Sequence, residues 1–149
     1  MGKRGEGWFA LQLVLFGVIL LAPPLSPVPF PSWLQALGVA LIAASGVLGT
    51  WGMIALGSSL SPFPKPVAGG KLVSAGPYAL VRHPIYSGLI MGTLGLGLLR
   101  GSLLGIVLAV VLFLFFDRKS HQEEIWLSES YPGYPAYQQR VRKLIPFIY

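Results

Sequence analysis

The sequence contains no cysteine and very little charge. Of its 149 residues, 11% are Asp, Glu, Lys or Arg, whereas 54% are hydrophobic. Soluble domains carry about 25% charged residues, so this composition excludes a water-soluble globular protein and equally a disordered one. The absence of cysteine excludes disulfides, thiolate metal ligands and a cysteine nucleophile. We therefore expect an integral membrane protein with a single domain, residues 1–149.

The chain is divided into four apolar runs, residues 8–22, 33–56, 84–99 and 102–116. The second run exceeds the ~20 residues that a helix needs to cross a bilayer. The other three have about 15 or 16 residues and need flanking residues or a thinner bilayer to span it. We predict an all-α polytopic protein with about four transmembrane helices, a C-terminal helical hairpin and a cytoplasmic helical tail. Five prolines end the first helix, namely Pro23, Pro24, Pro27, Pro29 and Pro31.

The basic residues orient these helices. With four spans, ten of the eleven Lys and Arg residues fall on one side of the membrane and only Arg100 on the other. The positive-inside rule then places both termini and the loop at 58–83 in the cytoplasm. No small-x-small cleavage site follows the first run, so we interpret it as a retained helix rather than a signal peptide. We expect a location in a prokaryotic inner membrane.

Small residues at four-residue spacing predict where helices pack closely. Ala36, Ala40 and Ala44 form one such stripe, and Gly88 and Gly92 form another. We expect both stripes to lie at helix–helix contacts.

Polar residues concentrate in two places, the first of which is the segment GPYALVRHPIYSG at 76–88. Proline suits the first turn of a helix, so Pro84 is expected to begin the third helix, with His83 extended before it. The free N–H groups of that helix start, together with Arg82, favour binding of a carboxylate or phosphate. Tyr78 and Tyr86 add aromatic faces, although Arg and Tyr at a helix end are equally typical of interfacial anchors.

The second polar region is the tail from Asp117 onward, which we expect to continue the fourth helix into the cytoplasm. Glu123 and Glu124 lie beside an apolar Ile-Trp-Leu stretch, which favours partial burial. His121 and Glu124 have a spacing that could ligate a metal, but two ligands are too few to indicate a site, so we expect none. The basic residues after Tyr137 are typical of a segment at an anionic membrane surface rather than of a nucleic-acid patch.

Three segments resemble the isoprenylcysteine carboxyl methyltransferase and phospholipid N-methyltransferase superfamily. They are the segment at 76–88, the downstream EEIWL at 123–127 and YPGYPAYQQRVRKLIP at 131–146. The resemblance covers about residues 56–146 and implies that S-adenosylmethionine binds at the cytoplasmic membrane face, with a lipid-tailed acceptor entering from the membrane. The acceptor atom, a carboxylate or an amine, stays open. Carried over to this sequence, the resemblance implies cofactor-binding residues Gly76, Pro77, Tyr78, Arg82, His83, Pro84, Tyr86, Glu123 and Glu124. For the reaction itself we expect three catalytic residues, Arg142, Glu124 and His83. Glu124 or His83 would take a proton from an amine acceptor, and Arg142 or Arg140 would hold an acidic headgroup.

Two other functions fit parts of the sequence. Membrane reductases that use NADPH carry a related element, typically RHPNYxGE, but here Ile85 replaces the Asn and Leu89 the Glu. A small transporter or assembly factor would place polar residues inside the spans, where this chain has little beyond Gln12 and Gln35.

Overall fold

The computed structural model describes residues 4–21 and 28–149, and its regular elements within these ranges are helical. The α-helices are α1 (Glu6–Leu21), α2 (Ser32–Leu56), α3 (Pro84–Leu99), α4 (Leu103–Ser130) and α5 (Tyr134–Arg140), with two 3-10 turns, η1 (Gly57–Ser59) and η2 (Gly76–Ala79). The predicted all-α class is confirmed for the described residues. Of the five prolines expected to end the first helix, Pro23, Pro24 and Pro27 lie outside the described residues.

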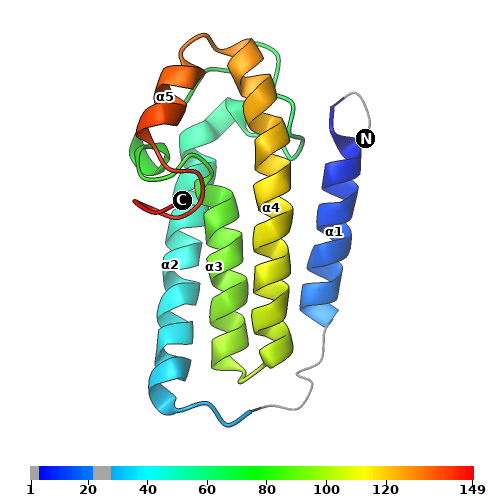
Figure 1. Ribbon diagram of the computed structural model, residues 1–149, viewed down its shortest axis with the longest axis vertical. Coiled ribbons are helices and arrows are strands. Elements are labelled where there is room, and N and C mark those ends of the chain that lie inside the picture. Colours follow the sequence, from blue (N-terminus) through cyan, green and yellow to red (C-terminus); the bar gives the residue numbers. More distant parts are fainter. Residues whose placement is uncertain (1–3, 22–27) are drawn as a thin grey trace.

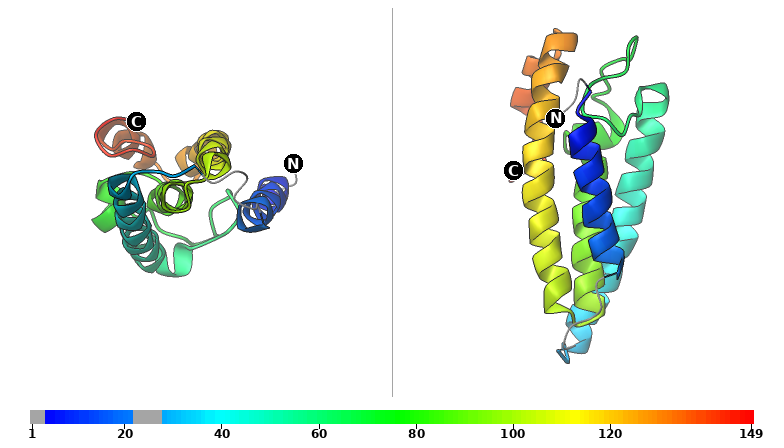
Figure 2. Two further views of the ribbon diagram at one scale, coloured as in Figure 1. Left: turned by 90° about the horizontal axis from the view of Figure 1, so that it is seen from below. Right: turned by 90° about the vertical axis from the view of Figure 1, so that its right-hand side faces the viewer.

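The four long helices run roughly parallel to one axis, with α3 between α2 and α4, and with α1 on the far side of α4 (Figure 1). An end-on view shows α1 standing apart from α2, with the chain between η1 and η2 crossing the space between them (Figure 2). The α3–α4 turn lies at one end of the bundle, whereas the start of α1 and the helix α5 lie at the other (Figure 1). The polar segments therefore gather at one end.

The contact between α2 and α3 is so close that only glycine fits. A Cβ atom added to Gly38 would lie 2.6 Å from the carbonyl oxygen of Gly95 and 2.8 Å from the amide nitrogen of Leu99. Gly88 and Gly92 do face α2, as expected, where they meet Gly49 and Ser45.

The expected packing role of Ala36, Ala40 and Ala44 is wrong, because all three are exposed. The helix uses Gly38, Ser45, Gly49 and Gly52 instead. A helix that is apolar on every side has no hydrophobic face from which the contact side could be read.

The hairpin between α3 and α4 is as short as expected. The Ser102 hydroxyl caps α4 by accepting a hydrogen bond from the Gly105 amide (3.1 Å). Gly101 adopts a left-handed conformation (φ +60°) that a side chain would strain. The hairpin holds the start of α3 and the charged half of α4 at the same end of the bundle.

One helix within the described ranges is both long and apolar enough to cross a membrane, the 28-residue stretch Ser32–Ser59. α1 and α3 are apolar but have 16 residues each. α4 has 28 residues, and it runs unbroken from the apolar fourth run into the charged tail. The continuation of the fourth helix into the tail is therefore confirmed.

Candidate active site

The segment before α3 is fixed by the C-terminal part of the chain. Val81 forms a parallel bridge with Arg142. The Arg82 amide donates to the carbonyl of Arg142 (2.8 Å), and the His83 amide donates to the carbonyl of Lys143 (3.1 Å). His83 immediately precedes α3, which begins at Pro84 as expected. The tail thus lies alongside the start of α3 and holds Arg82 and His83 against α4.

Glu124 is the centre of a buried polar network. Its Oε1 atom accepts hydrogen bonds from Arg82 Nε (2.7 Å) and from the His83 ring (3.0 Å), and its Oε2 atom accepts one from Gln138 (2.9 Å). The same guanidinium donates through Nη1 to the carbonyls of Gln138 (3.0 Å) and Val141 (2.5 Å). Both oxygens of Glu124 are used, so this carboxylate ties α4, the start of α3 and the tail together.

The network keeps Glu124 ionised. Burial by itself would raise the pKa of this carboxyl group, but the hydrogen bonds from His83 and Arg82 outweigh it and lower the pKa to about 2. A carboxylate with so low a pKa is a weak base at neutral pH. Glu124 is therefore better suited to holding Arg82 and His83 in place than to accepting a proton.

Glu123 faces a different set of groups. Its Oε2 atom accepts a hydrogen bond from the Tyr86 hydroxyl (2.8 Å) and lies 3.9 Å from Nδ1 of His83. Burial raises the pKa of the Glu123 carboxyl group, and His83 and Tyr86 oppose that rise. The Tyr86 ring stacks on the rings of Phe116 (4.3 Å between centroids) and His83 (5.4 Å). This stack orients the tyrosine toward Glu123.

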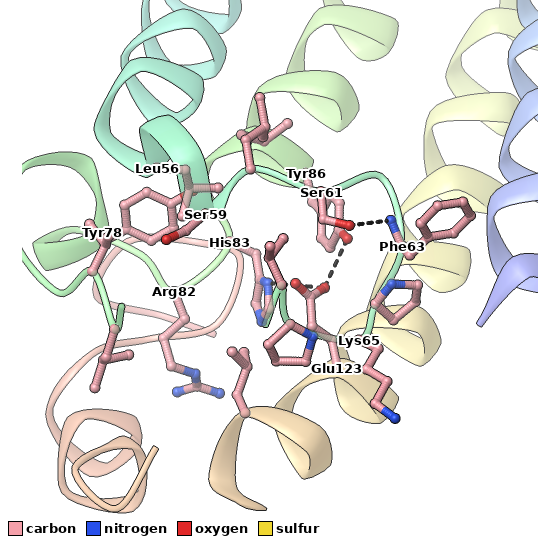
Figure 3. A pocket seen from close by; sticks show the side chains of 18 of the residues that line it. Leu56, Ser59, Ser61, Phe63, Lys65, Tyr78, Arg82, His83, Tyr86 and Glu123 are labelled. Atoms are coloured by element: carbon pink, nitrogen blue, oxygen red, sulfur yellow. Dashed lines mark hydrogen bonds and ion pairs between the residues drawn. The ribbon is translucent and has the colours of Figure 1, made fainter. Parts of the chain in front are cut away.

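A cavity of about 330 Å³ lies beside these residues, within the range of small-molecule sites. One side of the cavity, which we call the tyrosine side, is lined by Tyr78, Arg82 and the tail tyrosines Tyr134 and Tyr137. The other side is lined by Gln12, Phe63, Leu89 and Lys119. We call it the α1 side, because Gln12 belongs to α1 and Phe63 packs on Phe9 of that helix. Figure 3 shows Tyr78 and Arg82 apart from Phe63, with His83, Tyr86 and Glu123 between them.

The cavity brings together part of the predicted site. Five of the predicted residues line it, namely Tyr78, Arg82, His83, Tyr86 and Glu123. Five do not, namely Gly76, Pro77, Pro84, Glu124 and Arg142. The side chain of Arg142 is exposed, and its contribution here is the backbone carbonyl that pairs with Arg82. A catalytic role for the Arg142 side chain stays a prediction, as do the assigned roles of the other residues.

Two groups in the cavity wall have no role predicted from the sequence. Lys119 is buried and lines the α1 side. Tyr134 lines the tyrosine side, and its hydroxyl is the buried side-chain atom that lacks a hydrogen-bond partner within residues 4–21 and 28–149. The signal available for the tyrosines was their regular spacing of three residues, at Tyr131, Tyr134 and Tyr137. Lys119 had none, because its neighbours come from distant parts of the chain.

Comparison with known proteins identifies relatives over most of this chain. A protein-S-isoprenylcysteine O-methyltransferase B from Arabidopsis thaliana is 31% identical over 120 residues, which cover 78% of this chain and 61% of the relative. The protein-S-isoprenylcysteine O-methyltransferase of Mus musculus is 30% identical over 121 residues, 78% of this chain and 43% of that protein. A cobalt-zinc-cadmium resistance protein of Cupriavidus metallidurans is 36% identical over 76 residues, 50% of this chain and 35% of the relative.

The chain thus spans less than two thirds of the length of each of these relatives. The sequence profile described as "Phospholipid methyltransferase" matches residues 33–133, which include the start of α3, the two glutamates and the hairpin between them. The match confirms the resemblance drawn from the segments at 76–88 and 123–127. The chain belongs to the phospholipid methyltransferase family.

Proposed function

We propose that this protein transfers a methyl group from S-adenosylmethionine to a lipid-tailed acceptor at the cytoplasmic face of a membrane. The observation that carries the proposal is the contact between Tyr86 and Glu123 on the wall of a cavity next to apolar helices. These two residues belong to the two motifs of the resemblance and come from different helices. The methyltransferases among its relatives and the family assignment favour this reaction over the reductase alternative.

The cavity offers groups that suit the proposed cofactor, which supplies an electrophilic methyl group on a sulfonium centre. Glu123 has one oxygen bonded to Tyr86 and a second oxygen without a donor among the described residues, so it can accept hydrogen bonds from a ribose diol. The rings of Tyr78, Tyr134 and Tyr137 suit a cation. The buried Tyr134 hydroxyl has no hydrogen-bond partner among the described residues, so it fits a ligand that supplies one. We assign the cofactor to the tyrosine side on these grounds.

The residues of this chain act mainly by positioning and by excluding water. A methyl transfer is an in-line displacement, so holding donor and acceptor in line supplies much of the acceleration. Glu124 fixes Arg82 and His83 at the cavity wall. If the acceptor is a carboxylate, no proton has to leave. If it is an amine, Glu123 is the better-placed base, because burial raises its pKa whereas Glu124 is held at about 2.

We propose that α1 to α4 all cross the membrane, with both termini in the cytoplasm. The described basic residues support this arrangement. The start of α1, the chain between η1 and η2, and the tail lie at the end of the bundle opposite the α3–α4 turn (Figure 1). Arg4 precedes α1, Lys65 and Lys71 belong to the chain between η1 and η2, and Arg100 belongs to the α3–α4 turn. The 16-residue helices α1 and α3 rise about 24 Å each, which matches a locally thinned bilayer rather than a full ~30 Å core.

The test is cofactor binding followed by turnover. Titration calorimetry of purified protein with S-adenosylhomocysteine should show one site, and NADPH should show none. Radiolabelled methyl transfer from S-adenosylmethionine to prenylated and phospholipid acceptors in proteoliposomes then tests the reaction. Glu129→Gln serves as the control variant and should match the wild type in both measurements, because Glu129 is exposed on α4, the helix that also carries Glu123 and Glu124. Binding of NADPH but not of S-adenosylhomocysteine would overturn the proposal.

A further inference from the structure

Residues 144–149 form a closed turn after α5, which we call the 144–149 turn. The carbonyl of Tyr149 accepts hydrogen bonds from the amides of Leu144 (2.7 Å) and Ile145 (2.6 Å). The amide of Tyr149 in turn donates to the carbonyl of Ile145 (3.0 Å). Phe147 has a left-handed backbone conformation (φ 65°), which bulky residues rarely adopt. The turn therefore has a defined shape and holds Phe147 in a strained conformation.

The 144–149 turn presents apolar side chains on its outer side. Phe147 is 86% exposed, Ile148 is 74% exposed and Ile145 is 40% exposed, whereas Leu144 is buried. The turn is thus packed on the protein through one side and unpartnered on the other among the described residues. Large apolar side chains gathered on a surface indicate a contact with another apolar phase or partner.

Contacts with α4 set the position of the turn along the bundle. The Tyr149 hydroxyl donates to the Asp117 carboxylate (2.7 Å), and its ring centroid lies 6.0 Å from that of Phe113, one turn earlier on α4. Asp117 is the first charged residue after the apolar run at 102–116, and α4 exposes apolar side chains up to this level, Leu114 among them. The C-terminus accordingly lies level with the start of α3 rather than with α5 (Figure 1). In a membrane protein, this level is the boundary between acyl chains and headgroups.

Exposed arginines flank the turn. Arg142 precedes it by two residues, and Arg118 follows Asp117 on α4. Lys143 is paired with Asp117 (2.7 Å), whereas the two arginines have no carboxylate within 4.0 Å among the described residues. Guanidinium groups bind phosphates well, and anionic lipids attract basic residues close to the bilayer surface. An apolar turn between exposed arginines complements an anionic lipid surface in both polarity and charge.

The turn is joined to the segment that holds the candidate site. The Ser87 hydroxyl donates to the carbonyl of Leu144 (2.6 Å), and the His83 amide donates to the carbonyl of Lys143 (3.1 Å). A partner that holds the turn in place therefore also stabilises the backbone pairing that fixes His83.

We propose that the 144–149 turn inserts the side chains of Ile145, Phe147 and Ile148 into the cytoplasmic leaflet of the membrane. Arg118 and Arg142 bind the headgroups of anionic lipids beside it. The inference goes beyond the methyl-transfer reaction, because it involves neither the cofactor nor the acceptor, and it rests on the proposed arrangement of four spanning helices. A bilayer fits this surface better than a protein partner does, because the turn lies at the level where α4 itself leaves its apolar run.

The first experiment measures the depth of the turn in a bilayer. The chain has no cysteine, so Phe147→Cys and Ile148→Cys each carry a single nitroxide label, and the second position makes the test independent of the strained backbone at Phe147. Leu114→Cys is the lipid-facing reference on α4, and Ala136→Cys, exposed on α5, is the water-facing control. The protein is reconstituted in vesicles of phosphatidylcholine and phosphatidylglycerol. The collision rates of each label with oxygen, which concentrates among acyl chains, and with a water-soluble nickel chelate are then compared.

The labels at Phe147 and Ile148 should collide more with oxygen than with nickel, as the label at Leu114 does, and the label at Ala136 should show the reverse. Labels on the turn that behave like the one at Ala136 would overturn the proposal. Labels shielded from both reagents would also overturn it, because a protein such as a second copy of this chain would then cover the turn. A label at Leu114 that collides mainly with nickel would refute the arrangement of spanning helices itself, which is a separate outcome. Neither cofactor nor acceptor is present, so the result is independent of the proposed reaction.

The second experiment tests the headgroup charge. The label at Ile148 is compared in vesicles of phosphatidylcholine with and without phosphatidylglycerol, alone and combined with Arg118→Gln and Arg142→Gln. We expect phosphatidylglycerol to raise the ratio of oxygen to nickel collisions, and we expect the double substitution to abolish this rise. Arg100→Gln, in the α3–α4 turn at the opposite end of the bundle, is the matched control and should leave the rise intact. The same ratio in both lipids would refute the binding of anionic headgroups.

Discussion

Replacing Glu124 by glutamine should cost stability in a way that depends on pH. The substitution keeps the size of the side chain but removes the charge that accepts hydrogen bonds from Arg82, His83 and Gln138. Folding lowers the pKa of this carboxyl group from 4.5 to about 2. The ionised carboxylate therefore stabilises the folded protein above pH 4.5, by about 3 kcal/mol at 1.36 kcal/mol per pKa unit. The side chain is 6% exposed, so little of this contribution is lost to solvent screening.

The direction of the pKa shift determines the pH range of the assay. Since the folded pKa is the lower one, the stabilisation is complete at pH 7 and is lost as the pH falls from about 4.5 toward 2. Glu124→Gln should be less stable than the wild type by about 3 kcal/mol at pH 7, and this gap should narrow in acid. Unfolding free energies in detergent micelles at pH 7, 5 and 3 measure it, with the exposed Glu129→Gln as control. A gap that stays constant from pH 7 to pH 3 would refute the reasoning, because the loss would then not depend on ionisation.

The remaining predictions concern packing, binding, topology and substrate entry. Gly38→Ala should lower the thermal unfolding midpoint, because its Cβ would meet backbone atoms at 2.6 and 2.8 Å, whereas Gly46→Ala, which meets nothing within 4 Å, should be neutral or stabilising. Arg82→Ala should weaken binding of S-adenosylhomocysteine by about tenfold to a hundredfold; unchanged affinity in calorimetry would contradict its place in the site. Of two reporters fused after Tyr149, the one that is active only in the cytoplasm should give a signal. A signal from the reporter that is active only outside the cell would mean a reversed topology or an odd number of spans. An acceptor without its lipid tail should be methylated negligibly in proteoliposomes, and comparable turnover would favour a site open to water.

The sequence was most informative where polar residues interrupt apolar ones. Pro84 begins α3, and Arg100 and Gly101 lie in the turn after Leu99, as the breaks in the apolar pattern predicted. These positions are determined locally, by the missing N–H of proline and by the charged residue that ends the third run. The two motifs that meet at Tyr86 and Glu123 were found in the same way.

Other features depend on tertiary packing, which a single sequence does not reveal. The side of α2 that meets α3 could not be predicted, because α2 is apolar all round and alanine and glycine looked equally suited to the contact. The contact between Lys119 and Gln12 joins two residues far apart in the chain. The sequence predicts a role for the Arg142 side chain, whereas the structure shows its backbone carbonyl accepting a hydrogen bond from the Arg82 amide.

The pairing of the tail with the start of α3 has a consequence for how the protein matures. Arg82 and His83 leave the ribosome well before Arg142 and Lys143, whose carbonyls bind their amides, and before Gln138, which completes the contacts of Glu124. A nascent chain that ends after Ser130 already contains α1 to α4 but has none of these three groups. Insertion into the membrane and assembly of the cavity are therefore separable events, and the second waits until the tail has been translated and has folded back onto α3 and α4.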